Sequence, residues 1–150
     1  MKTKTMVEKT SSLHRNLPLL LLKTREGLMA HFRPILNEHG ITEQQWRVMR
    51  VLDECGDLEP HELCRACCIL SPSMAGILKR MEELDLVQKI RLKDQRRLIV
   101  KPTAVALELI QTISQQTEKY YAQIEQQIGT TNLNGLYRML DDILSRLAEK

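Results

Sequence analysis

The sequence predicts a mainly α-helical fold with a small β-hairpin, on two observations. Over most of the chain, apolar residues return at spacings of three, four and seven, which is the period of a helix with one buried face. Residues 86–101 differ, because their apolar positions fall on two short runs joined by a polar segment, as in a β-hairpin. With 150 residues, 43% of them apolar and 27% charged, the chain is expected to form one globular domain.

The N-terminal part is expected to hold a flexible arm and then a helix. Residues 1–15 are polar and lack an apolar period, so we expect an arm there, followed by a single domain over residues 16–150. The first helix is expected at about residues 16–39, where Pro34 removes one backbone donor and predicts a kink. Gly40 can adopt the left-handed conformation that ends helices.

The apolar run at residues 17–22 raises the question of a signal peptide or a membrane span. It is only about a third of the length of a span and is followed at once by Lys23 and Arg25. No targeting or membrane-spanning segment is therefore predicted, and the protein is expected to be cytoplasmic.

A helix-turn-helix is predicted in the middle of the chain. Thr42 followed by Gln45 is a capping-box pattern that begins one helix, and Leu58 is expected to add a short strand after it. Two further short helices are predicted over residues 60–84, separated by a break at residues 70–72.

The second helix of this pair has a readable start. Ser71 is expected to cap it by accepting a hydrogen bond from a free backbone N–H, and Pro72 suits the first helical position. Met74, Leu78 and Met81 then return at helical spacing, which predicts the buried face of this helix.

Positive charge gathers in the predicted hairpin. Residues 86–101 have a net charge of +5, whereas the whole chain has +3, so the remainder carries −2. Local positive charge on a hairpin beside a helix-turn-helix is expected of a protein that binds duplex DNA. A basic hairpin alone could equally be a solvated edge whose lysines deter aggregation. The adjoining helix pair favours DNA.

Two long helical stripes follow the hairpin. Thr103 is expected to cap a helix that runs to about Gly129, with one polar step at Thr117, and residues 130–132 are expected to break the chain. A second stripe occupies residues 133–147. These stripes are longer than a small DNA-binding core can cover, which favours a partner chain. The alternative is that the two helices pack only on each other.

The four cysteines have two readings. Cys64 and Cys67 are spaced as in metal and redox sites, but no second pair follows at the distance of a zinc ribbon, and Cys68 crowds the position. Small buried thiols on a helix are therefore favoured.

No catalytic site is predicted, so the chain is not expected to be an enzyme. His61-Glu62 begins a zinc-protease pattern, but Arg65 stands where the second histidine is required. The 6 glycines are scattered and form no phosphate-binding loop. Neither a cofactor nor a metal is expected.

The order of these elements, with Asp94-Gln95-Arg96-Arg97 at the hairpin tip and Thr103 opening a long helix, resembles the MarR family of winged-helix regulators. The runs REGLMAHFRPIL, GITEQQWRVMRVL and KDQRRL resemble more narrowly the homoprotocatechuate-degradation operon regulators within that family. The resemblance implies a winged helix-turn-helix at about residues 42–103. It also implies a homodimer formed through helices at about residues 16–39 and 104–148.

The predicted DNA-contacting residues come from the second helix of the pair and from the wing. Hydroxyls and free amides at the helix start can meet phosphates or base edges, and Gly76 permits a close approach. The resemblance implies that Arg96, oriented by Asp94, enters the minor groove while Arg97 and Lys93 lie near the backbone. The full set is Ser71, Pro72, Ser73, Gly76, Lys79, Arg80, Arg91, Lys93, Asp94, Arg96 and Arg97.

The resemblance also implies a crevice for an aromatic acid between the dimer helices and the DNA-binding part. Such a crevice needs a cation for the carboxylate and an apolar wall for the ring. Arg25 is the preferred carboxylate partner, because it lies in an otherwise apolar helix. The other candidates are the cations Arg47 and Arg50, His31 for a phenol, and Met29 and Trp46 for the wall. Alternatively, the arginines pair with Glu26, Glu43 and Asp53.

The favoured function is that of a homodimeric repressor of an aromatic-acid catabolic operon. It is expected to bind a pseudo-palindromic operator in double-stranded DNA and to be released by a small phenolic acid. The alternative is a redox- or metal-responsive regulator that uses Cys64, Cys67 and Cys68. A third possibility is an architectural DNA-binding protein without an effector.

Overall fold

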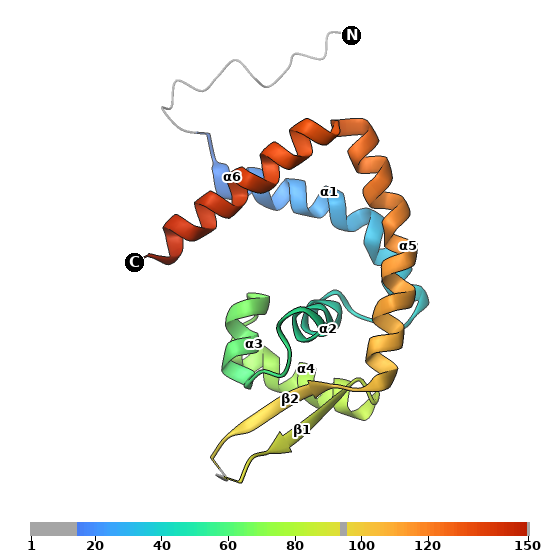
Figure 1. Cartoon of the computed structure of the whole chain (residues 1–150), viewed down its shortest axis with the longest axis vertical. Helices are drawn as coiled ribbons and strands as arrows, with labels where there is room; N and C mark the ends of the chain where they lie inside the picture. Colours follow the sequence, from blue (N-terminus) through green and yellow to red (C-terminus); the bar gives the residue numbers. More distant parts are fainter. Residues whose placement is uncertain (1–14, 94–95, 150) are drawn as a thin grey trace.

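The computed structural model describes residues 15–93 and 96–149, and it is mainly helical with a two-stranded wing, as the sequence predicts (Figure 1). In these residues the elements are α1 (Leu17–Glu38), α2 (Glu43–Cys55), α3 (Pro60–Cys67), α4 (Ser71–Glu83), β1 (Val87–Arg91), β2 (Leu98–Pro102), α5 (Ala104–Ile128) and α6 (Thr130–Ala148). None of the described helices is both long enough and apolar enough to cross a membrane.

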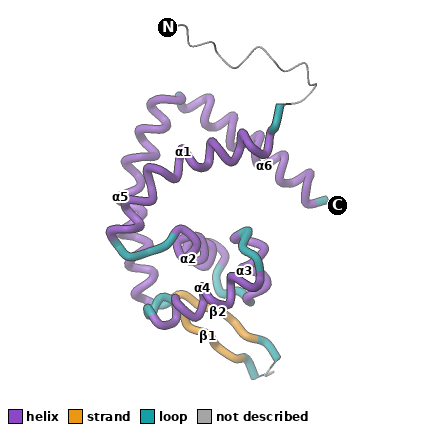
Figure 2. Tube along the Cα trace, turned by 180° about the vertical axis from the view of Figure 1, so that it is seen from behind, coloured by secondary structure: helices purple, strands orange, loops and turns teal. Residues whose placement is uncertain are grey.

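The molecule has two regions joined by α5 (Figures 1 and 2). The helix-turn-helix lobe comprises α2, α3, α4 and the hairpin of β1 and β2, residues 43–102. From the end of the hairpin, α5 runs along one side of the molecule to the opposite end, where α6 turns back. The distal region consists of α6, the far half of α5 and most of α1, which packs on α5.

The core lies in the helix-turn-helix lobe and at its junction with α1 and α5. Its members are apolar residues from every helix except α6 and from both strands. The most deeply buried side chains are Leu36, Val48, Met49, Leu52, Leu63, Cys67, Met74, Met81, Val87, Val100 and Ile113. The buried face of α4 is the one that the helical spacing predicts, with Met74, Leu78 and Met81 all buried.

The hairpin is antiparallel and is tied to the helices at its base. Its register pairs Val87 with Pro102 and Ile90 with Ile99. Val100 also exchanges two backbone hydrogen bonds with Leu58, at 2.8 and 3.2 Å. The strand expected at Leu58 is thus reduced to a single bridge.

Two predicted helix starts are confirmed. Thr42 and Gln45 form a reciprocal capping box, with the Gln45 amide N–H 3.1 Å from the Thr42 hydroxyl and the Thr42 amide N–H 3.0 Å from the Gln45 side chain. The Thr103 hydroxyl accepts from the amide of Ala106 at 3.1 Å and starts α5. In both cases a side-chain oxygen satisfies a free donor at the helix end.

Two local predictions are wrong. Ser71 does not cap α4, because Leu70 takes the capping position with an extended backbone and accepts through its carbonyl from Ser73 and Met74. Residues 130–132 do not break the chain, since α6 begins at Thr130 directly after Gly129. With a φ of 89°, Gly129 makes the whole turn by itself.

The distal region leaves apolar surface uncovered. No described residue of α6 is buried, and the start of α1 is exposed as well. The large exposed side chains there include Leu17, Leu19, Leu20, Leu21, Leu22, Tyr137, Met139, Ile143, Leu144 and Leu147. The two C-terminal helices therefore do not hide their stripes by packing on each other.

Candidate DNA interface and ligand pocket

The outer face of α4 carries the residues that the sequence assigns to DNA. Ser71, Ser73, Lys79 and Arg80 are all exposed, opposite the buried face of the helix. A Cβ added at Gly76 would meet no atom within 4 Å, so the chain's own packing does not require a glycine there. The open space beside Gly76 fits a helix that approaches another molecule closely.

Arg80 is available to a partner despite an ion pair. Its Nη1 lies 3.2 Å from Glu83 one turn further along α4, and both side chains are at least half exposed. An exposed pair of this kind contributes at most about 1 kcal/mol, because solvent screens it. A phosphate or a guanine can therefore replace Glu83 at little cost.

The wing arginines differ in their surroundings. Asp94, the predicted orienting residue at the tip, lies outside the described residues. Arg96 lines a hollow of about 450 Å³ between α3, α4 and the wing. Arg97, by contrast, reaches back to Glu59 at the start of α3, with its Nε and Nη2 each 2.6 Å from the same carboxylate oxygen. Lys93 is exposed near the tip, and Arg91 is exposed on β1.

A second hollow of about 450 Å³ lies where α1, α2 and α5 meet. We call it the α1–α2–α5 pocket. It brings together four of the six residues predicted for an effector, since its lining comprises Arg25, Leu28, Met29, Phe32, Trp46, Arg50, Ser114, Thr117, Glu118 and Tyr121. The wall from α5 is the part that the sequence did not predict. In the sequence, the one sign of this wall is Thr117, a polar residue within the apolar stripe of the helix. The structure buries Thr117.

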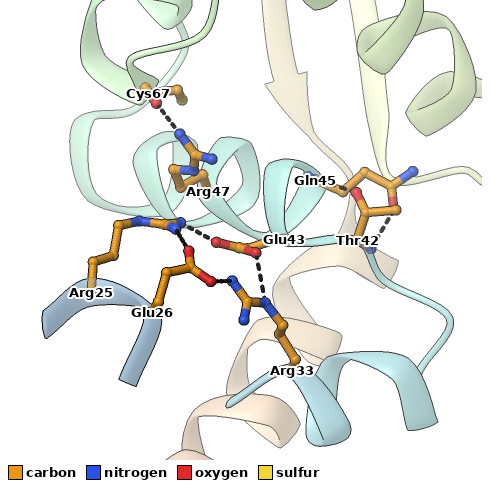
Figure 3. Close-up of polar contacts among 8 residues, drawn as sticks. All are labelled: Arg25, Glu26, Arg33, Thr42, Glu43, Gln45, Arg47 and Cys67. Carbon is orange, nitrogen blue, oxygen red and sulfur yellow. Dashed lines mark hydrogen bonds and ion pairs between the residues drawn. The ribbon is translucent and has the colours of Figure 1, made fainter. Parts of the chain in front are cut away.

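Two predicted effector residues do not line this pocket. Arg47 reaches from α2 to α3, where its Nη1 donates to the carbonyl of Cys67 at 2.8 Å (Figure 3). That carbonyl belongs to the last turn of α3. A cation there satisfies a free acceptor and interacts favourably with the partial negative charge at the C-terminal end of the helix. His31 is exposed and packs on Tyr120, with 5.6 Å between ring centroids.

Arg25 is held in a network of ion pairs that crosses from α1 to the start of α2 (Figure 3). It contacts Glu43 and also Glu26, at 3.1 Å in the second case. Arg33 contacts the same two carboxylates at 3.1 and 2.7 Å. For Arg25, pairing with Glu26 and Glu43 is the alternative that the sequence left open.

The network shifts the ionisation of Glu43. Burial alone would raise the pKa of this carboxyl, but hydrogen bonds from Arg25 and Arg33 outweigh it, so the pKa lies below its ordinary value. Glu43 is therefore ionised at neutral pH and keeps Arg25 occupied.

Arg50 lines the pocket from α2 and lies in a different setting. Its guanidinium is 5.9 Å from the centre of the Trp46 ring, and its ion pairs are with Glu54 at 2.5 Å and Asp53 at 3.7 Å on its own helix. Tyr121 is nearby on α5. Burial raises the pKa of its phenol, as does Tyr137, while Arg50 acts in the opposite direction. The Tyr121 hydroxyl thus keeps its proton at neutral pH and can donate a hydrogen bond.

Among the cysteines, Cys67 is in a setting that disfavours reactivity, and Cys55 and Cys68 are exposed. Cys67 is buried, and burial raises the pKa of its thiol to about 11. A thiol needs a lowered pKa to be a good nucleophile or ligand at neutral pH. In the described ranges, no group of three or more His, Cys, Asp or Glu side chains could hold a metal ion.

Three known proteins resemble the chain over most of its length. It is 41% identical over 143 residues to the HTH-type transcriptional regulator FarR of Neisseria gonorrhoeae, covering 93% of this chain and 94% of FarR. It is 38% identical over 134 residues to the homoprotocatechuate degradative operon repressor of Escherichia coli, covering 89% and 90%. The crystal structure of NadR in complex with 4-hydroxyphenylacetate superposes with a TM-score of 0.79 at 40% identity, covering 93% and 96%.

The MarR family model matches residues 41–99, which span α2 to the second strand of the wing. Together with relatives that are about 40% identical over nine tenths of the chain, this match confirms the family that the helix order and the wing predicted. The chain belongs to the MarR family of transcriptional regulators, in which dimerisation is typical.

Proposed function

We propose that this chain is a homodimeric repressor that binds operator DNA through α4 and the wing and is released by a small aromatic acid. The single observation that carries the effector is the α1–α2–α5 pocket, which combines cations, aromatic rings and a protonated phenol. It acts as a regulator and not as an enzyme, in the cytoplasm where bacterial DNA lies. We propose residues 16–150 as its single domain; the predicted N-terminal arm, residues 1–15, lies outside the described residues except for Arg15.

The DNA-binding part of the proposal rests on placement. The outer face of α4 and the basic wing lie at the same end of the molecule (Figure 1), away from the uncovered apolar surface of the distal region. A dimer made through α1, α5 and α6 would leave both lobes free to contact two half-sites. Half-sites that suit such a dimer lie about 34–36 Å apart on one face of the duplex.

Arg50 replaces Arg25 as the preferred carboxylate partner in this proposal. Arg25 is held by a Glu43 carboxylate that is itself fixed by Arg33, so a ligand would have to break a network. Among the described residues, the ion-pair partners of Arg50 are Asp53 and Glu54 on its own helix, and Glu54 is more than half exposed. A ligand carboxylate can displace such partners, and Tyr121 can donate a second hydrogen bond to it.

The remaining walls suit the rest of a phenolic acid. Trp46, Met29 and Phe32 offer apolar surface for the ring. Glu118 and the hydroxyl of Ser114 can accept a hydrogen bond from a phenolic hydroxyl. Among the similar structures, that of NadR contains 4-hydroxyphenylacetate, a compound of this class.

The pocket lies where a ligand can act on DNA binding. It takes walls from α1 and α5, which belong to the distal region, and from α2, which belongs to the helix-turn-helix lobe. A ligand that binds one arrangement of these helices better than another shifts the population towards it. If that arrangement changes the spacing of the two lobes, both cannot dock into successive major grooves at once.

The test is release of the protein from DNA by defined acids. An operator is first selected from a random duplex library with the wild-type protein, and its complex is titrated with 4-hydroxyphenylacetate, 3,4-dihydroxyphenylacetate and 4-methylphenol. The two acids are expected to release the protein, and 4-methylphenol is expected to fail because it lacks the carboxylate. For the Arg50→Gln variant, release from the operator should require an acid concentration at least about tenfold higher. This is the factor for losing one charge-assisted hydrogen bond.

The matched controls are Arg33→Gln and Arg25→Gln. Arg33 carries the same charge on α1 but does not line the pocket and reaches Arg25 only through Glu43, so its variant should change the response less than Arg50→Gln does. If Arg50→Gln and wild type are released by the same acid concentration, Arg50 is not part of the site. If only Arg25→Gln loses its response to the acids, Arg25 is the carboxylate partner. Release by neither acid would refute the effector proposal.

A further inference from the structure

Beyond its base, the wing is connected to the start of α3 by an ion pair between Arg97 and Glu59. Arg97 lies just after the wing tip, and its carbonyl accepts from the amide of Leu92 at 3.1 Å, which closes the hairpin. Its side chain crosses to Glu59, where Nε and Nη2 share one carboxylate oxygen at 2.6 Å each. Two residues 38 positions apart in the sequence thus connect the wing to the first helix of the helix-turn-helix.

Glu59 is itself held in place. Its side chain is only 19% exposed, whereas that of Arg97 is 58% exposed. Its backbone amide donates to the side chain of Glu62 at 2.8 Å, which fixes it at the start of α3. Its second carboxylate oxygen lies 3.4 Å from the His61 ring. The carboxylate is therefore the fixed member of the pair, and the arginine is the member that comes to it.

The pair contributes to where the distal part of the wing lies relative to α3. The backbone bridge between Leu58 and Val100 holds the base of the hairpin, and an ion pair between Lys89 and Glu82 at 3.3 Å connects the middle of β1 to α4. Beyond the base, a hollow separates the wing from α3 and α4, with Glu59, Lys89 and Arg96 among its lining residues. The Glu59–Arg97 pair connects the wing to α3 at the Glu59 side of this hollow. Without it, the part of the wing beyond Lys89 would lose its ion pair to α3.

We infer that Arg97 is a positioning residue that holds the wing at the angle needed for DNA, with Glu59 as its anchor, and that it does not bind phosphate. This inference rests on the proposed DNA-binding function and reassigns Arg97 within the predicted DNA-contacting set. Both donors of its guanidinium that face α3 are used inside the protein. Arg96, its neighbour at the tip, keeps the DNA-contacting role.

Salt dependence separates the two roles. Each phosphate contact releases condensed counterions, so the slope of log affinity against log salt changes by about 0.9 when one contact is lost. Arg97→Gln should weaken operator binding about fivefold with an unchanged slope. That factor corresponds to an exposed ion pair worth about 1 kcal/mol. Arg96→Gln, with the same change of charge one residue away, should make the slope shallower by about 1.

A double-mutant cycle tests whether Glu59 acts through Arg97. Glu59→Gln should also weaken operator binding about fivefold, although it removes a negative charge from a DNA-binding surface. The double variant Glu59→Gln/Arg97→Gln, whose net charge equals that of wild type, should bind no worse than the weaker single variant. Thermal unfolding of all four proteins checks that each variant folds as wild type does.

The outcomes are distinct. A shallower slope for Arg97→Gln would show a lost phosphate contact and overturn the inference. Tighter operator binding by Glu59→Gln would show that the carboxylate merely competes with DNA, and additive losses in the double variant would show that the two residues act separately. Either result also overturns the inference. Failure of the wild-type protein to select any duplex would instead refute the proposed function itself.

Discussion

The helix-turn-helix lobe and the distal region are built from the same kinds of residue but are completed in different ways. The lobe buries Leu63, Met74 and Val100 within one chain and closes its helices with local caps. In the distal region, α6 has no buried residue, although its apolar stripe repeats as regularly as that of α4. Periodicity therefore predicts that a helix has an apolar face, but not whether the same chain covers it.

This difference predicts that core substitutions in the lobe act on folding of the single chain. Leu63→Ala removes a side chain with no exposed surface and should lower the free energy of unfolding by about 2–5 kcal/mol. Urea unfolding followed by circular dichroism measures this loss. The matched control is Leu70→Ala, because Leu70 is 78% exposed and should change stability by about 0.5 kcal/mol or less.

In the distal region, substitution should act on association instead. Leu144 is 66% exposed, and Leu144→Arg would place a charge on the apolar face of α6. We expect the dimer dissociation constant to rise about 30-fold, which corresponds to a loss of about 2 kcal/mol at an interface. Sedimentation velocity over a range of protein concentrations measures this change.

The control for association is Ser145→Arg, which adds the same charge at a polar position next to Leu144. It should leave the dissociation constant close to that of wild type. If Leu144→Arg and Ser145→Arg behave alike, the exposed face of α6 is not the dimer contact. The contrast between the two regions would then have another cause.

A smaller effect is expected inside the lobe at Arg47. Arg47→Met removes the donor to the Cys67 carbonyl, but it also removes a buried Nε that has no hydrogen-bond partner among the described residues. The two changes oppose each other, so we expect a net loss of about 1 kcal/mol in unfolding free energy. The response to aromatic acids should be unchanged, since Arg47 does not line the pocket. A lost response with intact stability would contradict this placement.

The smallest effect concerns pH at the junction of the two regions. The pKa of Glu43 is lowered in the folded protein, so its contribution to stability is present above the ordinary pKa of 4.5. It is lost as the pH falls through the lower folded value. Glu43→Gln should therefore be less stable than wild type at pH 7, and the gap should narrow at about pH 3. A gap that is constant over this range would mean that the Arg25 and Arg33 contacts contribute nothing through charge.

The sequence predicted the fold well because most of its signals are local. Thr42 and Thr103 cap helices through residues three positions away, and apolar spacing identifies buried faces within one element. Ser71 failed because the cap depends on the backbone conformation of Leu70, which the side-chain chemistry of the next residue does not reveal. The orienting role of Asp94 and the kink expected at Pro34 stay predictions.

The candidate sites were less predictable because their partners are far apart in the sequence. Arg47 and Arg50 are three residues apart on α2, yet one reaches Cys67 on α3 and the other lies beside Trp46 in the pocket. Nothing local distinguishes the two arginines. The same holds for Arg97, whose partner Glu59 lies on another element.

The continuity of α5 between Thr103 and Gly129 fixes an angular phase between the face of the lobe proposed to bind DNA and the apolar face of α6. One residue added within α5 would turn everything after it by about 100° and advance it by about 1.5 Å. Seven added residues would nearly restore the phase while lengthening α5 by about 10 Å. Relatives with a different separation between their lobes can therefore change the length of this helix only in such steps. A single insertion would point α6 away from its partner.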